Sequence, residues 1–152
     1  MNISQLKAQV NLIDEKVKME ASIPGKTPII MDYIPPIGTG EGYTSLEVLL
    51  ISLAACYGTT IKSLITFRLK KEIRGMSLNI EGDRMTEHPM KFHTIRLLLS
   101  IDSPDLQLNE LTAIAAIAEE KYCPVWAMIK GDVDIETELN IERSTLKGGI
   151  YV

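Results

Sequence analysis

The residues of this sequence with the most distinctive chemistry are Cys56 and Cys123, the only two cysteines in the chain. Each lies in an apolar stretch typical of a helix, Cys56 within LISLAACYGTT and Cys123 within AEEKYCPVW. Two thiols can form a working dithiol, bind a metal, or serve as small hydrophobic side chains. For Cys56, which is flanked by small apolar residues, a place in the core is the simplest interpretation.

The position of Cys123 favours a reactive thiol. Pro124 interrupts the preceding helical pattern but is favoured in the first turn of a new helix, so we expect a helix that starts with Cys123 at its N-terminus. Free amides and the positive end of a helix dipole stabilise a thiolate, which predicts a lowered pKa for Cys123. Trp126, in the same segment, is most simply a core residue.

A zinc site is another use for the two thiols, since His88 and His93 would complete a Cys₂His₂ set. The thiols lack the close C-x₂₋₄-C spacing of such sites, and His93 falls in a segment rich in strand-forming residues. We therefore expect no metal. The dithiol and core interpretations both remain open at this point.

Composition indicates one globular domain over residues 1–152. The chain is 45% hydrophobic and 24% charged, close to the globular average, and a chain of this length buries roughly 70% of its unfolded surface. The net charge of −4 and the absence of a long basic run leave no positive surface for a phosphate backbone. We expect no nucleic-acid partner.

The most apolar window, Leu46–Tyr57, predicts a buried helix. It covers twelve residues and contains Glu47 and Ser52, whereas a membrane span needs about 20 apolar residues, so we expect no membrane association. The N-terminal MNISQLKAQVNLIDEK lacks the pattern of a secretory signal, which predicts a cytoplasmic protein. In that reducing compartment a lasting structural disulfide is rare.

Hydrophobic periodicity and turn residues predict an α+β fold with the element order βββαββααβ. Thr44 and Glu47 have the spacing of a capping box at the start of the long helix. The final strand is predicted from strict alternation, and we expect one antiparallel sheet system with helices packed on it. The expected strands are 6–12, 16–23, 27–34, 76–82, 92–101 and 132–142, and the expected helices are about 45–70, 108–122 and one that begins at 124.

Three separated blocks of the sequence resemble one protein family. They are TSLEVLLISLAACYGTT, the pair IEGDR and HPMKFHTI, and AEEKYCPVW. In this order, with a cysteine in the long helix and Cys-Pro after the second helix, they resemble the OsmC/Ohr family of organic hydroperoxide reductases. The resemblance covers nearly the whole chain and is closer to the OsmC-like branch than to the well-characterised reductases.

The resemblance implies an OsmC-like fold, with antiparallel sheets wrapped around a long buried helix in an intertwined homodimer. It also implies a thiol-dependent peroxidase that reduces alkyl or lipid hydroperoxides, with Cys56 as the attacking thiol and Cys123 as the resolving thiol. The expected reductant is an external dithiol, such as a lipoyl protein, and no cofactor is expected. The apolar helix independently favours a dimer, because one sheet covers only one of its faces.

Two positions depart from the pattern of the characterised reductases. Residues 1–67 contain no arginine to stabilise the Cys56 thiolate, and Leu46 stands where those enzymes have a glutamate, ten residues before Cys56. We therefore keep two alternatives: a small hydrophobic ligand-binding protein with weak or no peroxidase activity, and a redox sensor that uses the same dithiol. The natural hydroperoxide and reductant do not follow from the sequence.

Overall fold

The computed structural model describes residues 4–144 of the chain, which form two compact units divided between Leu49 and Leu50. The first unit is a small antiparallel sheet in the order β1–β2–β3. Its strands are β1 (Gln9–Leu12), β2 (Met19–Ser22) and β3 (Ile29–Met31). This sheet confirms the predicted meander with shorter strands. The single domain expected for residues 1–152 stays a prediction.

Helix α1 (Ser45–Leu64) begins with the predicted capping box. The backbone N–H of Thr44 donates to Glu47 Oε2 at 2.7 Å, and the N–H of Glu47 donates to Thr44 Oγ1 at 3.3 Å. These bonds satisfy backbone donors that the first turn of a helix leaves unpaired. The role of Glu47 as a capping residue is thus confirmed.

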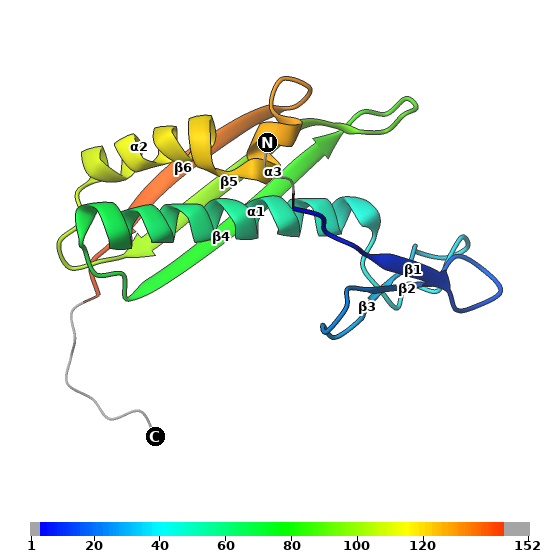
Figure 1. Cartoon of the computed structure of the whole chain (residues 1–152). Helices are drawn as coiled ribbons and strands as arrows, with labels where there is room; N and C mark the ends of the chain where they lie inside the picture. The colour runs from blue at the N-terminus through cyan, green and yellow to red at the C-terminus, as the bar shows by residue number, and fades with distance from the viewer. Residues whose placement is uncertain (1–3, 145–152) are drawn as a thin grey trace. The chain divides into compact units, whose positions relative to one another are not determined.

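The second unit contains the rest of α1 and a three-stranded sheet in the order β4–β5–β6. The complete element order confirms the predicted βββαββααβ arrangement. Figure 1 shows α1 and α2 on the same face of this sheet. The elements after α1 are η1 (Ile65–Leu69), β4 (Gly75–Arg84), β5 (Phe92–Asp102), α2 (Leu108–Ile117), η2 (Ala118–Tyr122), α3 (Pro124–Ile129) and β6 (Asp134–Glu142).

The direction of the last strand differs from the prediction. β4 runs antiparallel to β5, but β6 runs parallel to it, with Leu78, Leu99 and Leu139 in register across the three strands. A parallel neighbour needs a long crossover, and α2, η2 and α3 supply one between β5 and β6. The expected purely antiparallel system is therefore wrong for this sheet, which is mixed.

The core of the second unit lies between this sheet and the helices. Alternate residues of β5 point to one face, as the two-residue period of a strand requires. The fully buried or nearly buried residues of that face are Ile95, Leu97, Leu99 and Ile101. Helix α2 adds Leu111, Ile114 and Ala115 at helical spacing.

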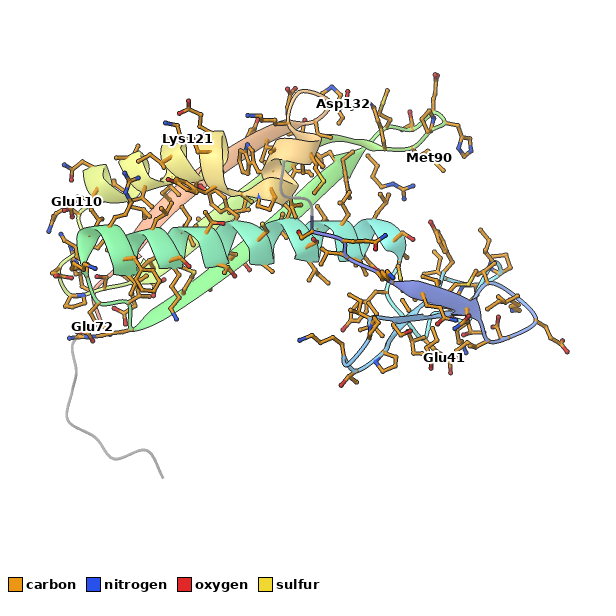
Figure 2. The ribbon with its side chains drawn as sticks, in the orientation of Figure 1. Glu41, Glu72, Met90, Glu110, Lys121 and Asp132 are labelled. Atoms are coloured by element: carbon orange, nitrogen blue, oxygen red, sulfur yellow. The ribbon has the colours of Figure 1, made fainter. Side chains whose placement is uncertain are left out.

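Both longer helices end in a wide π-type turn that the sequence pattern did not predict. η1 follows α1 directly, and η2 follows α2 and ends at Tyr122, the residue before Cys123. Helix α2 starts with a capping box of its own, in which the backbone N–H of Gln107 donates to Glu110 Oε2 at 2.9 Å. Glu110 is labelled in Figure 2.

The long helix is only partly buried in the single chain. The 25 residues Ser45–Leu69 are long and apolar enough to cross a membrane. An apolar window of 18 residues within them has a mean hydropathy of 1.7, and 28% of this window is buried. The helix also places Leu53, Tyr57 and Ile61, all fully buried, in the core, as the core helix of a soluble protein does. Length and composition alone therefore do not identify a membrane span. The expected burial of this helix on every side depends on a second copy of the chain and stays a prediction.

Candidate functional site

The second unit brings the two cysteines together. Cys56 lies on α1, Cys123 precedes α3, and their Sγ atoms are 3.2 Å apart across a sequence separation of 67 residues. A disulfide bond is about 2.05 Å long, so both thiols are free in this structure and a movement of roughly 1 Å would join them. The arrangement can therefore support dithiol–disulfide chemistry within one chain.

Local backbone bonds fix the conformation of the segment around Cys123. Its N–H donates to Ala118 O at 2.9 Å, which closes η2, and its carbonyl accepts from Ala127 N at 3.0 Å, which opens α3. Pro124 occupies the first position of α3 and needs no hydrogen-bond partner for its nitrogen. The predicted restart of a helix after Cys123 is confirmed.

The expected lowered pKa of Cys123 is wrong. The side chain is nearly inaccessible, with 2% of its surface exposed. Burial is the largest cause that raises the pKa of this thiol to about 11, and the hydrogen bond to Cys56 adds to it, while the amides of Trp126 and Val125 oppose it. Helix α3 has only six residues, so its N-terminus cannot compensate for the loss of water. Cys123 is a protonated thiol at neutral pH, and Cys56 is the more exposed of the two.

The residue after Cys56 links the two cysteine-bearing segments. The Tyr57 hydroxyl donates to Glu119 Oε1 at 2.9 Å, and the Tyr57 ring stacks on Trp126 with centroids 5.2 Å apart and an interplanar angle of 25°. Burial, the nearby Glu119 charge and this bond raise the pKa of Tyr57, so the phenol stays protonated. Trp126 is a core residue, as predicted, and it also contacts this site.

Sequence reasoning did not identify Tyr57 or Glu119. A signal was present for Glu119, because it lies four residues after the buried Ala115, a spacing that keeps two residues on one helical face. An acidic residue at the border of an apolar stripe needs a polar partner. The sequence does not name that partner, since Tyr57 lies 62 residues away.

Among residues 4–144, neither histidine forms a hydrogen bond with Cys56 or Cys123. His93 is exposed on β5, where its Nδ1 lies 2.8 Å from Thr94 Oγ1. Within residues 4–144, no group of three or more His, Cys, Asp or Glu side chains is placed to hold a metal ion.

Comparison with known proteins gives a family match and several structural matches. A family model described as OsmC-like protein matches residues 38–138. A hypothetical protein from Aquifex aeolicus is 18% identical, with 94% of this chain and 100% of that chain covered and a TM-score of 0.81. An OsmC-like protein from Mycoplasma pneumoniae is 22% identical, with coverages of 91% and 97% and a TM-score of 0.78.

A third structural match is the organic hydroperoxide resistance protein OhrB of Bacillus subtilis. It is 18% identical, with 90% of this chain and 98% of that chain covered and a TM-score of 0.63. No curated protein matches significantly. At these identities the solved structures establish the likeness of the fold, and the family match rests on the sequence of residues 38–138.

Proposed function

Since the chain belongs to the OsmC-like protein family, we propose that it is a thiol-dependent peroxidase that reduces organic hydroperoxides through Cys56 and Cys123. Membership of this family supports a redox or peroxide-related role. The observation that carries the finer proposal is the distance of 3.2 Å between the two Sγ atoms. Residues that are 67 positions apart and serve only as small core side chains do not need this contact.

The proposed cycle has three balanced steps. The Cys56 thiolate attacks the peroxide oxygen of ROOH, the O–O bond breaks, and with one proton the products are Cys56 sulfenic acid and the alcohol ROH. The Cys123 thiol then attacks the sulfenic sulfur and gives the Cys56–Cys123 disulfide and water. An external dithiol reduces this disulfide and is itself oxidised to a disulfide.

The environments of the two thiols support this assignment of roles. The raised pKa of Cys123 keeps its thiol protonated, which disfavours it as the first nucleophile. Its proton can leave with the hydroxyl of the sulfenic acid as water in the second step. Cys56 is the more exposed thiol and is therefore proposed to meet the peroxide.

Mass spectrometry of the thiols after one equivalent of cumene hydroperoxide tests the proposal. We expect the reduced protein to lose two hydrogen atoms, to contain one Cys56–Cys123 disulfide, and to recover both thiols with dihydrolipoamide. Repeated peroxide consumption with that reductant supports a peroxidase, and a single oxidation without turnover supports a sensor. Two free thiols in the presence of surviving peroxide would contradict both.

One observation favours a second function, the binding of a small hydrophobic ligand. Within the first unit, a hollow of about 480 Å³ is lined mainly by Val10, Val17, Met19, Met31 and Ile37. Apolar hollows of this size suit small ligands. Native mass spectrometry of the purified protein would detect a retained lipid-like molecule, and a ligand-free protein with peroxidase turnover would contradict this second function.

A further inference from the structure

Tyr57 contacts the chain on both sides of Cys123. Its hydroxyl bonds to Glu119, four residues before Cys123, and its ring stacks on Trp126, three residues after it. Tyr57 is fully buried and directly follows Cys56 in α1. One side chain next to the first thiol therefore holds the segment that carries the second thiol.

The backbone hydrogen bonds around Cys123 do not hold its segment against α1. The bonds from Cys123 N to Ala118 O and from Ala127 N to Cys123 O both lie within the segment 118–127. They fix the shape of that segment, but they leave its distance from α1 free. The contacts of Tyr57 with Glu119 and Trp126 do connect it to α1, at the turn of α1 that carries Cys56.

From this geometry we infer that Tyr57 and Glu119 are positioning residues that keep the Cys123 thiol within reach of Cys56. The inference rests on the proposed function in taking the Cys56–Cys123 disulfide as a step of the cycle. Disulfide formation within a protein depends on the effective concentration of one thiol at the other, which falls when their segments move independently. Loss of the Tyr57–Glu119 bond should therefore weaken disulfide formation without removing either sulfur.

A glutathione titration measures this effective concentration without any peroxide. Two protein thiols and one oxidised glutathione give one protein disulfide and two reduced glutathione molecules, and the equilibrium constant is read from the disulfide fraction. Tyr57→Phe keeps the stacked ring and removes only the hydroxyl, and Glu119→Ala removes the acceptor. We expect each to lower the equilibrium constant about five- to tenfold, which is the size of one ordinary hydrogen bond within a protein.

Two further variants separate positioning from general structural damage. Glu119→Gln retains an acceptor oxygen for the hydroxyl and should behave close to the wild type. Glu120→Ala removes an exposed carboxylate from the same turn and should leave the constant unchanged. Circular dichroism and urea unfolding of the reduced proteins establish that each variant is folded.

The outcomes distinguish this inference from the proposed function. An unchanged equilibrium constant in folded Tyr57→Phe and Glu119→Ala would overturn the positioning role, whatever the protein does with peroxide. An equal fall in Glu120→Ala would overturn it too. A fall confined to the two expected variants supports the positioning role even if the wild type consumes no peroxide, in which case only the peroxidase assignment fails.

Discussion

Gly58 brings the backbone of α1 against Leu78 of β4: a Cβ atom at position 58 would lie 2.8 Å from Leu78 Cδ1. Alanine at this position would gain about 1 kcal/mol of helix propensity, and the end of the leucine side chain can rotate away. We therefore expect Gly58→Ala to be close to neutral. The two methyl groups of valine in Gly58→Val need more room than this rotation of Leu78 provides. We expect this variant to lose about 1–3 kcal/mol of unfolding free energy.

Urea unfolding measures both effects, and Thr59→Val is the matched control because Thr59 is the exposed neighbour on the same helix. That variant should lie within about 0.5 kcal/mol of the wild type. A Gly58→Val protein as stable as the wild type would show that α1 does not approach β4 this closely.

The two cysteine variants should fail at different steps of the proposed cycle. Cys56→Ser should consume no peroxide, because the attacking thiol is missing. Cys123→Ser should still complete a first turnover and leave Cys56 as sulfenic or overoxidised acid, since no thiol resolves it. Trapping with dimedone followed by mass spectrometry detects these species, and the reverse pattern would exchange the two roles.

Stability at alkaline pH should depend on Cys123. The folded protein holds the pKa of this thiol at about 11, against an ordinary value of 9.0, mainly because the thiol is buried. A group whose pKa is raised in the folded state contributes to the free energy of unfolding. This contribution is complete below the unfolded-state pKa and is lost as the pH rises through the folded-state pKa. The unfolding free energy of the wild type should therefore fall relative to Cys123→Ser between about pH 9 and pH 11.

Urea unfolding of both reduced proteins across this range gives the difference directly, and titrating groups that do not contact Cys123 cancel in the comparison. A constant difference from pH 8 upward would mean that Cys123 ionises as readily in the folded state as in the unfolded one.

The parts of the fold that depend on neighbouring residues could be predicted from the sequence. The capping box of Thr44 and Glu47 needs only a spacing of three, and the helix restart at Pro124 follows from the missing N–H of proline. The parallel direction of β6 could not be predicted, because the alternation of Ile135, Leu139 and Ile141 is the same in either direction.

The candidate site shows the same division. The family resemblance predicts that Cys56 and Cys123 act as a pair. The spacing of the two cysteines alone does not exclude that they are only small core residues. The pKa of Cys123 was predicted with the wrong sign, because the sequence shows the helix N-terminus but not the burial that outweighs it. Tyr57 and Glu119 were missed because their contact depends on how α1 packs against η2.

Asp32 should stabilise the loop that precedes α1. Its carboxylate is 3% exposed and accepts from the backbone N–H groups of Tyr33 at 2.8 Å, Thr39 at 3.0 Å and Glu41 at 3.2 Å, and from the Thr39 hydroxyl at 2.7 Å. Burial alone would raise the pKa of this carboxyl, but the four hydrogen bonds outweigh it and hold the pKa well below its usual range.

Asp32→Asn should therefore lower the unfolding free energy at pH 7 by about 1–3 kcal/mol, because an amide NH₂ cannot accept from these donors. A carboxyl group whose pKa is lowered in the folded state contributes to the free energy of unfolding. This contribution is present above the unfolded-state pKa of about 3.9 and is lost as the pH falls through the folded-state pKa. Urea unfolding should show the difference between wild type and variant shrinking below about pH 4. Asp132→Asn, at an exposed carboxylate labelled in Figure 2, is the matched control and should be neutral.

The chain should form an obligate homodimer. In the described residues, large apolar side chains are exposed on both units, among them Val10, Leu12 and Ile29 in the first sheet and Ile51 and Phe67 on the long helix. Single exposed apolar residues are common on protein surfaces. The long helix has a larger apolar surface, because only 28% of its apolar window is buried, and such a surface indicates contact with a protein partner. A second copy brings a matching apolar helix, and closed two-fold assemblies are the commonest kind. Such an interface should bury more than about 2,000 Å² in total.

Light scattering from nanomolar to micromolar concentration measures the assembly, and unfolding should become harder as the protein concentration rises. Ile51→Glu places a charge on a residue that is 52% exposed in the single chain, so it would be harmless in a monomer and should disrupt a dimer that buries this face. Ala113→Glu adds the same charge to an exposed position of α2 and should leave the dimer intact. A compact monomer of 16.9 kDa that keeps its fold and activity, or an Ile51→Glu protein that assembles like the wild type, would contradict this prediction.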